Sequence, residues 1–174
     1  AVEYNKDGFI ESFYLEPRAI IWTKRIWRYV KPNDNNILFG NNKLFSILNE
    51  NIYNGNITPY QVTDDEFLKE LLITDLDTSS IELIGYKIKE DFIFDIDRLV
   101  SESRILGICP VVVSKVNQDT LDLYRVYFPQ ARKYLAQEKI QHSKLPGHIR
   151  TMDDVFFYRY FHGQIYKESN IYDR

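Results

Sequence analysis

The sequence predicts an α+β fold, a single domain in which a three-stranded antiparallel meander packs with several short helices. Three consecutive segments, DFIFDID (residues 91–97), RILGICPVVVSKV (104–116) and LDLYRVYF (121–128), show strand-like alternation or apolar runs separated by short polar turns. Helical periodicity is confined to short segments on either side of them. At 174 residues, 44% of them hydrophobic, the chain can bury one core. We divide it into an N-terminal extended segment, residues 1–19, and one folded domain, residues 20–174.

The first element of the domain is IIWTKRIWRYV, residues 20–30, whose apolar residues fit either a helical stripe or one face of a strand. Its β-branched and aromatic content favours a strand. Residues 42–54 form a clearer helix because their apolar side chains fall on one face. We expect Asn42 to cap this helix and Gly55 to adopt the left-handed conformation after its end.

Two short helices are expected before the meander. Thr63 and Glu66 have capping-box spacing, which predicts a helix that starts at Asp64. A serine pair precedes Ile81, and either serine is a suitable cap for a second helix that runs to Ile88.

The meander has one irregularity that the sequence itself predicts. Pro110 lies inside the second strand and has no N–H to donate, so we expect a kink, a bulge or an edge position there. The first strand is expected to present two faces, one with the side chains Phe92, Phe94 and Ile96, and the other with Asp91, Ile93, Asp95 and Asp97.

Two helices are predicted after the meander. Pro129 is suited to the first turn of a short helix that ends at Ala136. Thr151 is a suitable cap for a final helix over the run DDVFFYRYFHGQIYKES, residues 153–169.

The final helix carries more aromatic residues than one buried face can accommodate. At helical spacing they cover an arc of roughly 200°, about twice the width that a surface helix needs. The helix is therefore either buried on nearly all sides or in contact with another chain, and a terminal helix in a small domain favours contact. The composition, 15% aromatic, agrees with a binding surface. The predicted contact residues are Phe156, Phe157, Arg159, Tyr160, Tyr166, Tyr172 and Arg174.

Charge and cysteine content exclude several classes of function. The net charge is −3, and the densest basic cluster, Lys24, Arg25 and Arg28, is too short for a row of phosphates, so nucleic acid is not an expected partner. No segment reaches the roughly 20 apolar residues of a membrane span. The single cysteine, Cys109, cannot form an internal disulfide, and its apolar neighbours predict a buried, unreactive thiol.

No catalytic or metal-binding motif stands out. Three histidines, His142, His148 and His162, lack the cysteine partners and spacing of a zinc site. The sequence has no nucleophile elbow and no glycine-rich phosphate loop. We therefore expect no catalytic residue, cofactor or metal.

Six ordered segments resemble one protein family. YKESNIYDR, residues 166–174, is similar to the C-terminal motif of the gliding-motility protein GldN, called PorN in non-gliding relatives. FDIDRLVSESRILGICPVV, LYRVYFPQARKYLA, IIWTKRIWRYV, LFSILNENIYNGNITPY and DDEF also resemble family segments and occur in the family's order. The resemblance spans most of residues 20–174. KPNDNNILFG, residues 31–40, departs from the family pattern, which has an Asp-Leu-Arg-Glu-Lys-like segment there.

The resemblance implies a structural, non-enzymatic subunit of the type IX secretion system in the periplasm. Members of the family assemble with an outer-membrane lipoprotein, GldK or PorK, into a large ring on the inner side of the outer membrane. That ring is linked to the inner-membrane motor complex, which includes GldM or PorM. The implied partners of this chain are the lipoprotein, the periplasmic region of GldM or PorM, and further copies of itself.

An alternative function starts from the acidic residues of the first meander strand. Asp91, Asp95 and Asp97 suggest a carboxylate site for a metal or a sugar, and so a periplasmic enzyme or ligand-binding domain. A solvated strand face explains the same three residues more simply, because hard cations take their ligands from a tight loop.

Overall fold

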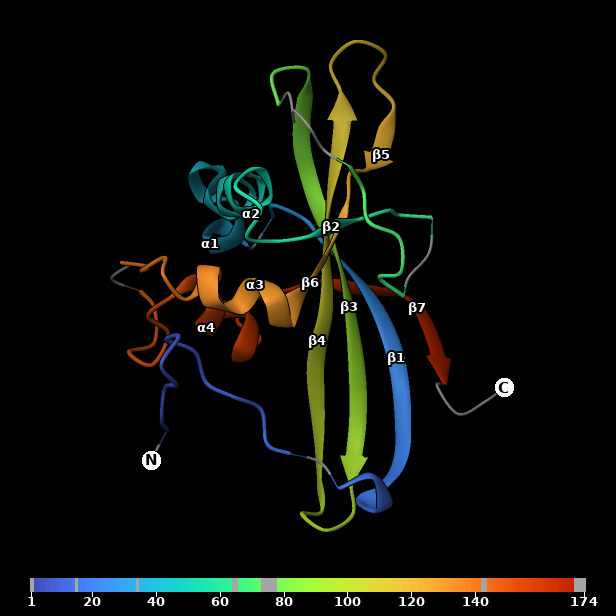
Figure 1. The fold of residues 1–174 in the computed structure, drawn as a ribbon, viewed down its shortest axis with the longest axis vertical. Coiled ribbons are helices and arrows are strands. Elements are labelled where there is room, and N and C mark those ends of the chain that lie inside the picture. The colour runs from blue at the N-terminus through green and yellow to red at the C-terminus, as the bar shows by residue number, and fades with distance from the viewer. Residues whose placement is uncertain are drawn as a thin grey trace.

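The computed structural model describes residues 2–14, 16–33, 35–63, 66–72, 78–141 and 144–170 (Figure 1). Within them, seven strands form one antiparallel sheet with the order β2–β6–β4–β3–β1–β7, and β5 pairs with β4. The predicted α+β single domain is confirmed. The strands are β1 (Ile20–Val30), β2 (Pro59–Tyr60), β3 (Ile81–Asp95), β4 (Val100–Ser114), β5 (Thr120–Asp122), β6 (Arg125–Tyr127) and β7 (Gln164–Asn170). The α-helices are α1 (Asn36–Phe39), α2 (Lys43–Tyr53), α3 (Phe128–Leu135) and α4 (Met152–Phe157), and short 3₁₀ turns span Pro17–Ala19 and Gly40–Asn42.

A long hairpin of β3 and β4 forms the centre of the sheet, and β1 pairs along the other side of β3. The helices gather on one side of the sheet (Figure 1), where the core lies. Tyr86 and Ile88 of β3 project into this core, as do Leu44 and Leu48 of α2 and Val155 of α4. Below the helices in Figure 1 the hairpin extends well past the core.

Several local predictions are confirmed. Residues 20–30 form a strand, and α2 occupies the predicted helix, with Gly55 at φ 78° just after its end. Asn42 precedes α2, but its side chain makes no capping hydrogen bond because the residue itself is left-handed, with φ 49°. Pro129 lies in the first turn of α3.

The third meander strand is divided into two. β5 pairs with residues 111–113 of β4, and β6 pairs with residues 107 and 108. The interruption lies opposite Pro110, whose carbonyl accepts a hydrogen bond from Leu123 N at 2.9 Å. Pro110 has no N–H, so the backbone hydrogen bonds between the strands are interrupted at this position. The irregularity predicted at this proline therefore appears mainly in the neighbouring strand.

Three predicted helices are not found as expected. The helix from residue 81 to Ile88 does not form, because β3 already begins at Ile81 and its buried and charged side chains alternate with the period of a strand. Asp64, the predicted start of another helix, lies outside the described residues, and the described residues 66–72 form no helix. The final helix ends at Phe157, because Arg159 is left-handed at φ 56° and the chain continues as β7.

Residues 2–14, here called the strap, have no regular secondary structure but pack against α3 and α4. Tyr4 Oη donates a hydrogen bond to Asp154 at 3.2 Å, and Arg132 donates to the carbonyl of Ile10 at 2.7 Å. The side chain of Ile10 is buried. The extended N-terminal segment is thus anchored to the domain.

Cys109 is buried on β4, as predicted. Burial raises the pKa of its thiol to about 12. None of the helices in the described ranges has the length and apolar character that a membrane-spanning helix requires.

Candidate protein-contact surfaces

The predicted contact residues do not form one surface. Phe156 is 1% exposed and belongs to the core, so it is not available to a partner in this conformation. Tyr160 and Tyr166 are 43% and 48% exposed, but one precedes β7 and the other lies within it. Phe157 and Arg159 are partly buried. Tyr172 and Arg174 lie outside the described residues.

α4 accounts for the buried part of the aromatic run. Thr151 caps the helix as predicted, in a reciprocal capping box with Asp154. Asp153 is buried and accepts two hydrogen bonds from Arg132, each 2.9 Å long. Burial raises the pKa of Asp153 and outweighs the lowering effect of Arg132. The helix is held on nearly all sides by its own chain, so burial, the less favoured alternative, is correct for residues 152–156.

A buried carboxylate fixes the turn between α4 and β7, residues 158–163. Glu90 of β3 has no solvent exposure, and it accepts hydrogen bonds from Arg159 and, at 3.1 Å, from Arg28 of β1. Arg28 also donates to the carbonyl of Gly163 at 3.2 Å. Nearby, Asn35 binds the backbone of His162 in both directions. These contacts place the first residue of β7 beside β1.

β7 is the last strand at one edge of the described sheet, and little of its surface is buried. Residues 164–169 are all exposed. Lys167 lies over the ring of Trp27, with Nζ 4.4 Å from the ring centre, and Lys24 pairs with Glu168 at 2.7 Å. No strand of the described residues pairs with the outer side of β7, and the strand carries exposed aromatic and charged side chains, a combination suited to a protein partner.

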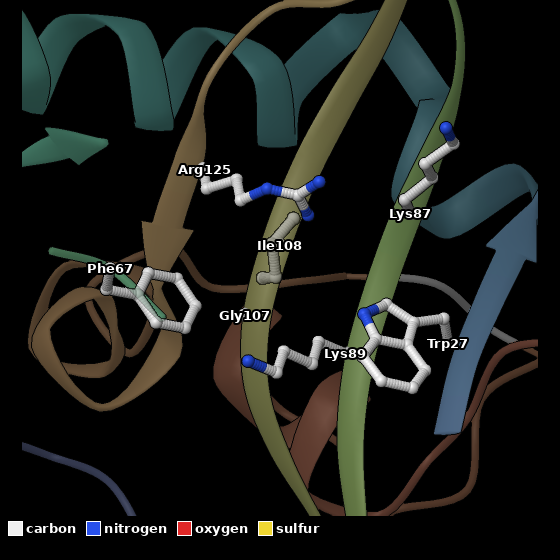
Figure 2. Close-up of a pocket in the computed structure, with 7 residues that line it drawn as sticks. All are labelled: Trp27, Phe67, Lys87, Lys89, Gly107, Ile108 and Arg125. Carbon is white, nitrogen blue, oxygen red and sulfur yellow. The ribbon is translucent and has the colours of Figure 1, made fainter. Parts of the chain in front are cut away.

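The sheet face opposite the helices is partly covered by the segment after β2. Figure 2 shows Phe67 beside Gly107 of β4, with Trp27 and Lys89 on the neighbouring strands. Lys89 Nζ lies 5.3 Å from the centre of the Phe67 ring. A side chain on Gly107 would come within 2.5 Å of that ring, so glycine is needed for this contact. The group leaves no room for a water-sized ligand.

Two larger grooves remain open. One, about 810 Å³, lies between β5 and β7, and the Lys87–Asp122 ion pair of 3.0 Å is part of its lining. Apolar side chains of Val111, Leu121 and Ile165 also line it. The other groove, about 640 Å³, lies between the strap and residues 101–106 of β4. Phe157 and Arg159 line this second groove, Tyr166 the first, and Tyr160 a third hollow of about 250 Å³.

Of the three meander aspartates, Asp91 and Asp95 share a face of β3 as predicted, but Asp97 does not belong to the strand. Asp91 pairs with Arg25 at 3.0 Å, and Asp95 pairs with Arg98 at 2.8 Å. Asp97 lies in the turn after β3, because the strand ends at Asp95, whose carboxylate accepts the Asp97 N–H. Hydrogen bonding from Arg98 lowers the pKa of Asp95. The carboxylates are therefore engaged by arginines on separate elements.

The described histidines are also dispersed. His148 packs edge-on against Tyr158, with the ring centres 4.6 Å apart, and His162 is in the turn before β7. His142 lies outside the described residues. In the part of the chain that the structure describes, no three His, Cys, Asp or Glu side chains are placed to hold a metal ion together.

Comparison with known sequences identifies a family for this chain. The sequence model described as gliding motility associated protein GldN matches residues 15–174. No curated protein matches the chain. Since the match covers nearly the whole chain, from the 3₁₀ turn before β1 through β7, this chain belongs to the GldN family of gliding-motility-associated proteins.

Proposed function

We propose that this chain is a structural, non-enzymatic subunit of the type IX secretion and gliding-motility machinery. It assembles in the periplasm with an outer-membrane lipoprotein, GldK or PorK, into a ring on the inner side of the outer membrane. It also contacts the periplasmic region of GldM or PorM. The observation that carries the proposal is the family match over residues 15–174.

The surface of the chain supports a contact role. Tyr160 and Tyr166 are large, half-exposed rings near the same exposed strand, and aromatic anchors of this kind dominate interface energies. Glu90 fixes the turn that carries Tyr160, so this ring is presented from a rigid position. A side chain that is already held in place loses less conformational entropy when a partner binds.

The acidic-site alternative gains no support from the geometry. A cation or sugar at Asp91 would compete with Arg25, and one at Asp95 would compete with Arg98. Asp91 instead joins β3 to β1, and Asp95 holds the turn after β3.

Co-purification with the lipoprotein partner tests the proposal. We expect wild-type chain to be retained, and Tyr160→Ala and Tyr166→Ala each to weaken binding by more than about 1 kcal/mol, roughly fivefold, while the domain stays folded. Tyr53→Ala is the matched control, since Tyr53 is 72% exposed on α2, away from β7. Failure of wild type to bind would refute the ring assignment, and unchanged affinity in both folded variants would refute only the contact residues.

A further inference from the structure

Within the described residues, the sheet has one edge at β7 and another along the first residues of β4, which lie in the lower part of Figure 1. β4 pairs with β6 from Gly107 and with β5 from Val111, so no described strand pairs with the outer side of residues 100–106. On the opposite side, β7 is the last strand of the described sheet. It has seven residues, which matches the length of the open stretch of β4. Open edges carry unpaired backbone groups that readily pair with another strand.

The directions of these two edges are compatible. Pairing is antiparallel at each step of β4–β3–β1–β7, so β4 and β7 run in opposite directions. We propose that copies of this chain associate head to tail, with β7 of one copy pairing to residues 100–106 of β4 in the next. The proposal rests on the self-association in the proposed function and assigns a surface to it. A contact between two different surfaces repeats from copy to copy and can close into a ring.

The side chains on the two edges can be assigned to faces from the strand register. Trp27 is directly opposite Lys167 on β7, and Arg25 is directly opposite Asp91 on β3. Asp91 is in turn opposite Arg104 on β4. Directly opposed residues share a face, as do residues two apart in a strand. Lys167 and Arg104 therefore lie on the same face of the sheet.

Glu102, two residues before Arg104, lies on this face as well. An antiparallel register that places Lys167 opposite Glu102 of the next copy adds a cation to a carboxylate that Arg98 and Arg104 already bind, at 3.0 and 3.2 Å, and it leaves Glu168 opposite Ser101. A shift of two residues would instead place Lys167 opposite Arg104, which like charges disfavour. Lys167 forms no ion pair with any described residue of its own chain, and its Nζ lies over the ring of Trp27, 4.4 Å from the ring centre.

The strap runs beside the open edge of β4 without pairing to it. Arg104 donates a hydrogen bond to the carbonyl of Phe13, while residues 11–14 are exposed and make no backbone hydrogen bond to β4 within the described residues. The groove of about 640 Å³ between the strap and β4 is where the incoming strand inserts. Phe9 and Phe157 line that groove and provide apolar contacts for its side chains.

Cysteine cross-linking tests the pairing in the full chain assembled with its lipoprotein partner. Lys167→Cys and Glu102→Cys place thiols on residues that are directly opposite in the proposed register, close enough for a disulfide. The native Cys109 is buried and does not interfere. We expect a mixture of the two single variants to give a one-to-one dimer, and the double variant to give a ladder of higher species. Glu82→Cys combined with Lys167→Cys is the control, since Glu82 is exposed at the other end of β3.

The outcomes separate this proposal from the proposed function. Assembly with the lipoprotein but no cross-link in the mixture would overturn head-to-tail pairing and leave the subunit role intact. A strong dimer from Lys167→Cys alone would also overturn it, in favour of symmetric pairing of two β7 strands. If the wild-type chain did not assemble with the lipoprotein, both the head-to-tail pairing and the proposed function would be overturned.

Discussion

Arg159 donates a hydrogen bond to Glu90, whose carboxylate is fully buried beneath the turn that leads into β7. Arg28 binds the other carboxylate oxygen at 3.1 Å. Three parts of the chain, β1, β3 and the turn over residues 158–163, thus meet at one negative charge. A buried charge is tolerated only when its partners remain in place, so Glu90 helps to fix the turn that leads into β7.

Glu90→Gln removes the charge and keeps the shape. We expect a loss of about 2–4 kcal/mol in the free energy of unfolding, because two arginines lose their partner while each retains partial access to water. Urea denaturation measures the loss. Glu82→Gln, on an exposed part of the same strand, should change the stability by less than about 0.5 kcal/mol. Equal effects for the two variants would contradict the role given to Glu90.

Gly163 is required by close packing at the same turn. A Cβ at this position would lie 2.7 Å from Cγ of Arg28 and 2.9 Å from the carbonyl oxygen of Tyr29. We expect Gly163→Ala to destabilise the fold by about 1–3 kcal/mol, since the added methyl must displace β1 or the turn. Gly147→Ala is the control, because nothing lies within 4 Å of its Cβ position, and thermal unfolding of both variants compares them.

Asp95 makes the free energy of unfolding depend on pH in the acid range. Its pKa in the folded state is lowered, first of all by the Arg98 hydrogen bond, so its contribution is present above the unfolded pKa and is lost as the pH falls through the folded pKa. The stability difference between wild type and Asp95→Asn should be complete above about pH 5 and shrink below it. Urea titrations from neutral to acid pH measure it, and a difference that grows towards acid would contradict the assignment.

Cys109 should be unreactive in the native protein. Its thiol is buried and has a pKa of about 12, so almost no thiolate exists near neutral pH. A thiol-specific reagent at pH 8 should modify the native chain far more slowly than the urea-unfolded chain. Fast native labelling would show that β4 opens where the structure holds it closed.

Much of the fold could be predicted because caps and turns depend only on residues that are close in the sequence. The capping geometry of Thr151 and the left-handed Gly55 depend on a few neighbouring residues, and both are found where the sequence predicts them. The helix expected up to Ile88 failed because a serine cap is a weaker signal than the alternation of the apolar Tyr86 and Ile88 with the charged Lys87 and Lys89.

The candidate site was harder to predict because it depends on distant partners. Helical periodicity continues through residue 159, yet the left-handed Arg159 is held by Glu90, 69 positions earlier in the chain. Glu90 itself looks like a surface charge within KIKEDF. Aromatic content alone does not separate Phe156, packed in the core, from Tyr160, exposed beside it. The β-branched Ile165 and the aromatic Tyr166 after Gly163 were the local signal that could have revealed β7.

The strap has a practical consequence for anyone who clones this domain. The family match begins at residue 15, but Ile10 and Tyr4 contribute to the interior and to the cap of α4. A gene trimmed to the family boundary would leave the Arg132–Asp153 pair exposed to solvent on one side. Poor expression of such a truncated product would then reflect a missing piece of the fold rather than a fault in the domain itself.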